Sequence, residues 1–219
     1  GLDADFIVLS GDLVHKRDDS CALEAFKGLL GKFRKDLKVY CLPGNHDVGN
    51  EALPQEVEAF VQRYGNDRFV HKEKDYTVIG FNSCVVKART AAEEAEYRWL
   101  EEQLVGAERG NPIIVVAHHP MFLNLPDEPE TYETLPVEMR MKYLQLFEKY
   151  GVDVYAYSYL KSGKHPDEPD AEAHYESTYG RLFAECPGLR GVVLVCESME
   201  FPSKDPHVAR PGTGGQIVD

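Results

Sequence analysis

Residues 39–47 read VYCLPGNHD, an apolar run that turns abruptly into a polar cluster. The first four residues are typical of a buried β-strand, which Pro43-Gly44 ends. Three polar side chains then follow without a gap: Asn45, His46 and Asp47. Amide, imidazole and carboxylate groups directly after a strand indicate either a tight turn or ligands for a metal ion.

The same arrangement occurs at two other places in the chain. Residues 6–9 (FIVL) lead into Gly11-Asp12, and residues 113–116 (IIVV) lead into His118-His119. Each apolar run predicts a strand that is buried on both faces. Because ligands bind at the carboxyl ends of the strands in open α/β sheets, we expect the three clusters to meet in one site. Glycine before the first two clusters would let the backbone turn tightly and approach a ligand.

Each cluster alone has a simpler interpretation. Asp12 could cap a helix that follows its strand, and Asn45 and Asp47 could merely shape a turn. A single histidine after a strand, such as His118, is more often a packing or surface residue than a ligand. Three clusters at three strand ends favour a shared metal site, and their oxygen and nitrogen donors suit Mn, Fe or Zn. His119 is expected to face away from the site and pack locally, because adjacent strand residues face opposite sides.

Helical periodicity separates the strands. Apolar residues at helical spacing predict helices over residues 20–33, 56–64, 91–105 and 137–150. Further strands are predicted over residues 76–81, 152–157 and 192–195. Strands that alternate with helices indicate an α/β protein built from crossover units. We predict one domain over residues 1–219, with a poorly ordered Pro- and Gly-rich tail over residues 201–219.

Composition limits the partners. Asp and Glu outnumber Lys and Arg by 37 to 24, which gives a formal net charge of −13. This charge argues against binding of duplex nucleic acid, but it allows phosphate chemistry where bound cations supply positive charge. No stretch approaches the roughly 18 apolar residues that a membrane-spanning helix needs. The cysteines, 5 in number, are widely spaced, which favours reduced thiols and a cytoplasmic location.

The three clusters together resemble the signature of the calcineurin-like metallophosphoesterases. GDLVH at residues 11–15, GNHD at residues 44–47 and His118 before Pro120 match three of its motifs in order. The match is closest to the calcineurin-like phosphoesterase-domain serine/threonine phosphatases, and it covers about residues 3–157. The resemblance implies a sandwich of mixed β-sheets flanked by helices, with two divalent metal ions. It also implies hydrolysis of a phosphomonoester, in a phosphorylated protein or in a small molecule.

The resemblance also assigns roles to individual residues. Asp12 would bridge the two metal ions, and Asn45 and His118 would bind the second ion. His46 would donate a proton to the leaving group or stabilise the phosphoryl group, and Asp47 would orient it. A metal-bound water would be the nucleophile, because paired cations lower the pKa of bound water.

Two motifs of the signature are not matched. DxH belongs on a strand before Leu2, and we interpret the opening GLDAD, which has no initiator Met, as a cut edge of a truncated domain. GHxH should follow residues 152–156, where the sequence has Tyr-Ser-Tyr-Leu at residues 157–160. By this count at most one metal ion is well held, by Asp12, Asn45 and His118. His165, in an acidic loop further on, is a poor substitute for the missing ligand.

The sequence therefore leaves two functions open. The first is a metal-dependent phosphoesterase whose site is incomplete in this chain. The second is a catalytically inactive phosphoesterase fold, or a gene fragment, that binds a partner through exposed acidic loops at residues 125–136 and 162–177. The substrate, the metal and the oligomeric state are not determined by the fold class.

Overall fold

The structure is a computed structural model that describes residues 4–107, 110–123, 125–152, 154–159, 168–185 and 189–195. The chain divides into two compact units. Unit 1 comprises residues 1–119 and 131–152, and unit 2 comprises residues 120–130 and 153–219. The prediction of a single domain over residues 1–219 stays a prediction.

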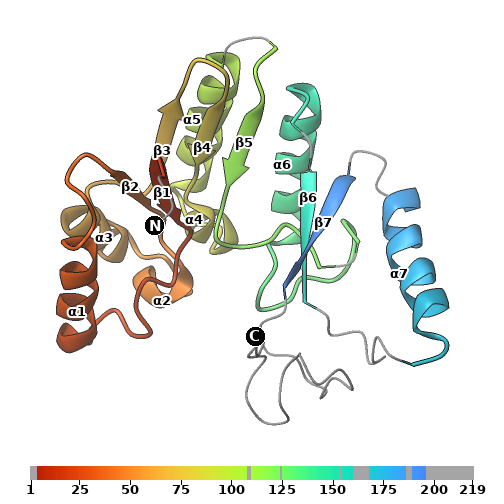
Figure 1. Cartoon of the computed structure of the whole chain (residues 1–219), viewed down its shortest axis with the longest axis horizontal. Helices are drawn as coiled ribbons and strands as arrows, with labels where there is room; N and C mark the ends of the chain where they lie inside the picture. Colours follow the sequence, from red (N-terminus) through yellow and green to blue (C-terminus); the bar gives the residue numbers. More distant parts are fainter. Residues whose placement is uncertain are drawn as a thin grey trace. The chain divides into compact units, whose positions relative to one another are not determined.

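Unit 1 contains two small sheets (Figure 1). In the first, β1 (Phe6–Leu9) pairs in parallel with β2 (Lys38–Cys41). In the second, β3 (Phe69–Lys72) runs antiparallel to β4 (Thr77–Gly80), and β4 pairs in parallel with β5 (Ile113–Val116). The predicted α/β class with mixed sheets is confirmed. The sequence gives no clear signal for β3, because only four residues form it and two of them are His71 and Lys72.

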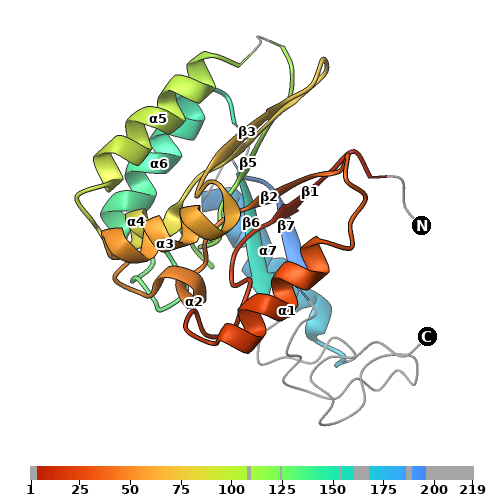
Figure 2. The ribbon, with the colours of Figure 1, turned by 90° about the vertical axis from the view of Figure 1, so that its left-hand side faces the viewer.

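Helices connect and cover these strands. They are α1 (Ser20–Leu30), α2 (Asn45–Val48), α3 (Pro54–Tyr64), α4 (Ser83–Lys87), α5 (Glu93–Val105) and α6 (Val137–Lys149). The four helices predicted from the sequence correspond to α1, α3, α5 and α6. Helices α5 and α6 lie side by side (Figure 2), and Lys149 of α6 forms an ion pair with Glu101 of α5.

The helix that follows β1 is capped by Asp19 and not by Asp12. Asp19 Oδ1 accepts a hydrogen bond from the backbone nitrogen of Ala22 at 3.0 Å, which satisfies one of the free donors at the start of α1. The simpler interpretation of Asp12, as the cap of this helix, is therefore excluded.

A buried apolar cluster connects the two sheets of unit 1. It contains Leu42, Phe69 and Val78, and Phe6 and Tyr40 pack against it. The rings of Tyr40 and Phe69 are stacked with their centroids 4.3 Å apart. Full burial of a side chain such as Leu42 contributes about 1.5–3 kcal/mol, so this cluster is a main source of the stability that fixes β1 and β2 against β4.

Strands β1 and β5 are less buried than the sequence predicts. Residues of β1 are half-buried, and Ile114 of β5 is 51% exposed, whereas every residue of β4 is buried. Among the described residues, β1 pairs only with β2, and β5 pairs only with β4. A continuous apolar run does not reveal whether a strand lies at the centre or at the edge of a sheet, so the prediction of burial on both faces is wrong here.

In unit 2, β6 (Val154–Tyr159) pairs in parallel with β7 (Leu189–Val195), and α7 (Ala171–Glu185) lies between them in the sequence. Helix α7 corrects the expected exposed loop at residues 162–177. The acidic, proline-containing sequence favours a loop, but Ala and Glu after Pro169 are good helix formers. Residues 162–167, with His165, lie outside the described residues, and so do Leu160 and the tail over residues 201–219.

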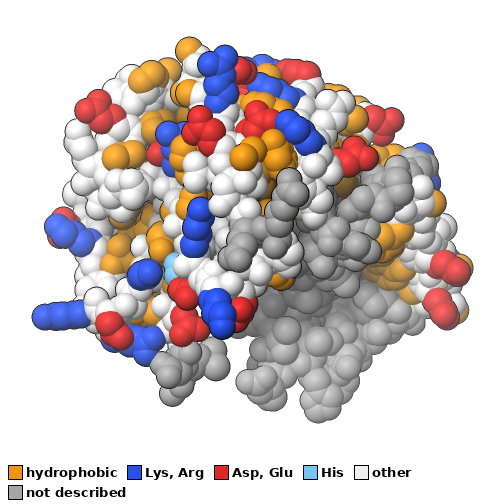
Figure 3. Space-filling view, turned by 90° about the horizontal axis from the view of Figure 1, so that it is seen from above, with side chains coloured by type: hydrophobic (Ala, Val, Ile, Leu, Met, Phe, Trp, Pro, Cys, Tyr) orange, Lys and Arg blue, Asp and Glu red, His pale blue; other side chains and the backbone are white. Residues whose placement is uncertain are grey.

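The described surface is mixed in charge. On the face drawn in Figure 3, acidic and basic side chains alternate over the residues that the structure describes. Among the described helices, none combines the length and the apolar content that a membrane span requires. The described cysteines, Cys21, Cys41 and Cys84, are free thiols.

Candidate metal centre

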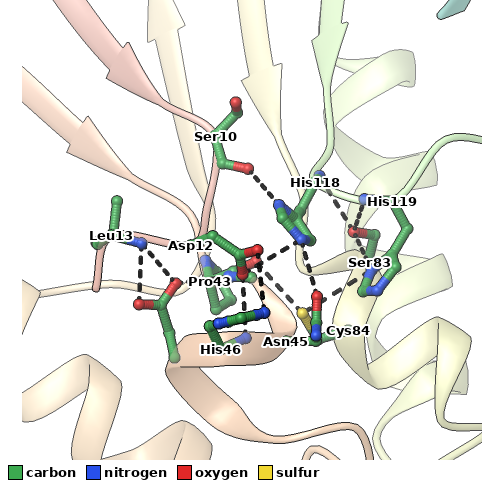
Figure 4. Close-up of polar contacts among 12 residues, drawn as sticks. Ser10, Asp12, Leu13, Pro43, Asn45, His46, Ser83, Cys84, His118 and His119 are labelled. Atoms are coloured by element: carbon green, nitrogen blue, oxygen red, sulfur yellow. Dashed lines mark hydrogen bonds and ion pairs between the residues drawn. The ribbon is translucent and has the colours of Figure 1, made fainter. Parts of the chain in front are cut away.

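The loops after β1, β2 and β5 meet and bring Asp12, Asn45 and His118 together (Figure 4). His118 Nε2 lies 3.4 Å from Asp12 Oδ1 and 3.2 Å from Asn45 Oδ1. Ligands that each bind one ion at about 2.0–2.2 Å lie roughly 3–3.5 Å from one another. The spacing of these three atoms therefore suits a single shared metal ion.

The orientation of His118 is fixed by the backbone. Its Nδ1 lies 2.9 Å from the carbonyl oxygen of Ser10, at the end of β1. Because a carbonyl oxygen can only accept, Nδ1 carries the proton and Nε2 of the neutral imidazole presents a lone pair. A histidine whose second nitrogen donates to a carbonyl is the usual arrangement at metal sites.

The orientation of Asn45 is fixed by a residue from a distant part of the chain. Asn45 Nδ2 donates to the hydroxyl of Tyr132 at 2.8 Å, which leaves Oδ1 facing His118. Tyr132 is 62% exposed, and its loop is held by Lys87, whose Nζ donates to the carbonyl of Thr131 at 2.7 Å. The sequence offers no signal for this contact, since Tyr132 lies in what reads as an exposed acidic loop.

The three converging atoms fit a divalent cation. With a neutral imidazole, Asp12 Oδ1, Asn45 Oδ1 and His118 Nε2 are all acceptors, and none can donate to another. A carboxylate, an amide oxygen and an imidazole nitrogen suit Mn, Fe or Zn. No group of three His, Cys, Asp or Glu side chains gathers in the part of the chain that the structure describes, because an amide supplies the third ligand here.

Two glycines allow these loops to interlock, as the sequence predicts. Gly11 has φ 109°, and a Cβ there would lie 2.4 Å from His118 Nδ1. A Cβ at Gly44 would lie 2.1 Å from Asp12 Oδ1. Asp12 has φ 51°, a left-handed conformation that costs a non-glycine residue about 1–2 kcal/mol. Its Oδ1 also accepts from the backbone nitrogen of His46 at 3.0 Å, which stabilises this conformation.

Asp47 holds two of these loops together. Its carboxylate is 3% exposed and accepts from the backbone nitrogens of Leu13 (3.0 Å), Val14 (3.4 Å) and Gly44 (2.8 Å). Burial raises the pKa of this carboxyl group, and the three backbone hydrogen bonds oppose that rise. These contacts differ from the predicted role, because among the described residues the carboxylate bonds to backbone donors and not to the His46 ring.

His46 is oriented by a backbone carbonyl. Its Nδ1 lies 2.7 Å from the carbonyl oxygen of His15, so Nδ1 carries a proton and donates it. Its Nε2 lies 3.9 Å from Asp12 Oδ2, on the partly exposed side of the ring. This geometry leaves Nε2 as the atom that can hold or deliver a proton beside the Asp12 carboxylate.

His119 packs away from the other site residues, as predicted. It is 7% exposed, and its Nδ1 lies 3.3 Å from Ser83 Oγ. Burial, and then the charges of His118 and Lys87, lower the pKa of His119 to about 3. Ser83 Oγ also accepts from the backbone nitrogens of His118 (3.2 Å) and His119 (2.9 Å), so this serine fixes the loop after β5. The sequence does not reveal the role of Ser83.

A cavity of ≈ 610 Å³ opens beside Asn45 and His46. Its remaining walls come from the loop after β1, the loop after α2 and one face of α3. They are formed by His15, Lys16, Arg17, Asp18, Gly49, Asn50, Glu51, Glu56 and Arg63. The volume is typical of a small-molecule or peptide side-chain site.

The arrangement has a counterpart among known proteins. The family model described as calcineurin-like phosphoesterase matches residues 1–158. The chain belongs to the calcineurin-like phosphoesterase family. The resemblance seen in the sequence is thereby confirmed, and so is the enzyme class, a metallophosphoesterase, at the level of this family.

Curated relatives in this family carry the name serine/threonine-protein phosphatase CPPED1. The protein of Danio rerio is 32% identical over 156 residues, which cover 67% of this chain and 50% of the relative. That of Rattus norvegicus is 27% identical and that of Homo sapiens 28% identical, and each match covers 89% of this chain and 65% of the relative. The chain thus spans half to about two thirds of the length of these phosphatases.

Proposed function

We propose that this calcineurin-like phosphoesterase chain carries a metal-dependent phosphomonoesterase site. Asp12, Asn45 and His118 hold a divalent metal ion, and His46 acts as the proton donor. The supporting observation is the convergence of three acceptor atoms within 3.4 Å of one another, beside a histidine whose second nitrogen is free.

The chemistry follows from these positions. The bound ion, with Mn²⁺ as our first choice, would neutralise charge on the phosphoryl oxygens and lower the pKa of a bound water. Asn45 and Asp12 fix the phosphoester against the N-terminal end of α2. His46 Nε2 delivers a proton to the leaving oxygen, a role that typically contributes about 10²–10⁴-fold in rate. Asp47 keeps His46 in place indirectly, by fixing the start of α2.

We propose phosphorylated protein as the substrate, with phosphoserine or phosphothreonine as the reacting group. The support is the printed name of the relatives, serine/threonine-protein phosphatase, together with an open site that a peptide side chain can enter. We further propose a cytoplasmic location, which is supported by free thiols at the three described cysteines.

The test is hydrolysis of a generic aryl phosphate with and without added Mn²⁺. We expect turnover that depends on the metal and that falls about 100-fold or more in His46→Ala, while metal content stays unchanged. His174→Ala in unit 2 is the matched control, because it removes a partly exposed imidazole from a helix outside the site.

The other outcome has a clear meaning as well. Correctly folded protein that hydrolyses no aryl phosphate with Mn²⁺, Fe²⁺ or Zn²⁺ would contradict the proposal. It would favour the second function that the sequence leaves open, a phosphoesterase fold that binds a partner without catalysis.

A further inference from the structure

The cavity beside the candidate metal centre contains a guanidinium group in a fixed position. Arg17 Nε donates to Glu56 Oε2 at 3.2 Å, and the guanidinium lies against Gly49, where a Cβ would be 3.3 Å from Arg17 Nη1. Gly49 has φ 76°, so a side chain is disfavoured there on conformational grounds too. The position of Arg17 therefore depends on an ion pair on one side and on a bare backbone on the other.

A second cation borders the same cavity without a partner. Arg63 is exposed and lies on α3 two helical turns after Glu56, so both side chains project from the same face of the helix. Among the described residues, neither Arg63 nor Lys16 has an ion-pair partner. In a chain with a formal net charge of −13, two unpaired cations and a fixed arginine in one cavity are an unusual concentration of positive groups.

The acidic residues of the cavity limit what these cations can bind. Glu56 is occupied by Arg17, whereas Asp18 and Glu51 are exposed on the cavity wall. They would repel a ligand that carries several negative charges. One additional anionic group, placed between Arg17 and Arg63, is the chemistry that this lining matches.

We infer that Arg17 and Arg63 form a specificity subsite for a second anionic group on the leaving-group side of the phosphoester. The inference rests on the proposed function, because the reacting phosphoryl group is assigned to Asp12, Asn45 and His118. Asn45 and His46 line one part of the cavity, and Arg17, Glu56 and Arg63 line another. A single substrate can therefore contact both. The preferred substrate class is a phosphoester with a neighbouring carboxylate or phosphate.

The test compares two matched pairs of substrates. The first pair is a phosphoserine peptide with Glu or with Gln as the next residue. The second pair is carboxyphenyl phosphate and its neutral carboxamide, which separates a small-molecule source of the anionic group from a peptide source. We expect kcat/KM to favour the charged member of at least one pair by roughly three- to tenfold.

Variants of Arg63 assign the preference to the subsite. Arg63→Gln should reduce the ratio of kcat/KM for charged and neutral substrates to about one, and Arg63→Glu should reverse it. Arg98→Gln is the matched control: it removes one arginine from the exposed face of α5, and the ratio should not change. A ratio of one in the unmodified protein, or a preference that survives Arg63→Glu, would overturn the inference.

A binding measurement separates this inference from the proposed hydrolysis. The non-hydrolysable phosphonate analogues of the two peptides are titrated calorimetrically in the presence of Mn²⁺. Tighter binding of the Glu analogue that is lost in Arg63→Gln supports the subsite even if no substrate is turned over. Hydrolysis of aryl phosphate with no difference between the analogues supports the catalytic proposal and excludes the subsite.

Discussion

Two polar regions of unit 1 differ in how their groups are paired. Next to β4, Glu96 is 4% exposed, and its carboxylate accepts from Asn82 N (2.7 Å) and Arg68 Nη1 (2.9 Å). Nearby, both oxygens of Glu93 accept from Lys142. In the candidate metal centre, by contrast, Asp12, Asn45 and His118 present acceptors to one another. The first region is complete as it stands, whereas the second requires a positive charge that the three side chains do not supply.

The difference separates structural polar groups from functional ones. Buried polar groups that meet partners of the opposite kind stabilise a fold, and unmet acceptors cost free energy. A protein retains such a cost where the arrangement serves binding or catalysis. The same comparison explains the supporting residues, because Asp47 and Ser83 are fully paired and only the three atoms at the centre are not.

The largest effect is expected at the centre itself. Asp12→Asn keeps the size of the side chain and tolerates the left-handed backbone, but it removes the carboxylate. We expect the affinity for Mn²⁺, measured by calorimetry, to fall about 100-fold or more. Metal-free Asp12→Asn should be at least as stable as the metal-free parent, because an amide can donate to a neighbouring acceptor. Asp75→Asn, on an exposed turn, is the control; unchanged Mn²⁺ affinity in Asp12→Asn would show that the site is wrongly assigned.

The second effect tests whether Asp47 is structural. Asp47→Asn turns an amide donor toward backbone N–H donors, so we expect a loss of about 2–4 kcal/mol in the free energy of unfolding. Urea denaturation measures this loss, and Asp36→Asn, an exposed aspartate, provides the reference. A cost no larger than that of the reference would mean that the loop after β1 is held by other contacts.

The third effect concerns pH and the paired region. Burial raises the pKa of Glu96 to about 7 from 4.5, although the hydrogen bond from Asn82 and the charge of Arg68 oppose the shift. The folded state therefore keeps a proton that the unfolded chain releases, and stability falls as pH rises from about 4.5 to 7. This contribution is on the order of 2–3 kcal/mol. Denaturation across this range should show a flatter profile for Glu96→Gln than for the parent or for Glu58→Gln. Equal slopes in all three proteins would contradict the assignment.

The smallest effect is expected at Tyr132. Tyr132→Phe removes the hydroxyl that accepts from Asn45 Nδ2, so the amide loses its fixed orientation. We expect Mn²⁺ affinity to fall about fivefold, with little change in stability, because Tyr132 is largely exposed. Tyr76→Phe is the matched control. A loss in Tyr132→Phe no greater than in the control would show that Asn45 is oriented by other means.

The sequence predicts the strands better than their surroundings. The apolar runs at β1, β2, β4 and β5 are continuous, and each ends at Gly or at a polar cluster, so their existence is clear from the pattern. Short elements escape this reasoning. Helix α4 has only five residues, and it forms because Asn82 caps it, with its Oδ1 accepting from the backbone nitrogens of Cys84 and Val85. In unit 2, helix α7 replaces an expected loop because helix propensity after Pro169 outweighs the acidic composition.

The proximity of Asp12, Asn45 and His118 follows from a rule about strand ends, but the contacts that orient them do not. Those contacts come from backbone carbonyls and from Tyr132 and Ser83, which carry no distinguishing pattern. The metal-binding and catalytic roles of the predicted residues stay predictions until the experiments above are made.

The hydrogen bond between His118 and the carbonyl of Ser10 has a consequence for the folding of the chain. These residues are 108 positions apart, so most of unit 1 lies inside the loop that the contact closes. Loop closure over this distance costs roughly 4 kcal/mol in chain entropy. Strands β1 and β2, in contrast, are joined by a short helical connection and can pair early. Refolding protein should therefore regain its first sheet well before it regains the centre, which has no partly formed precursor in the chain.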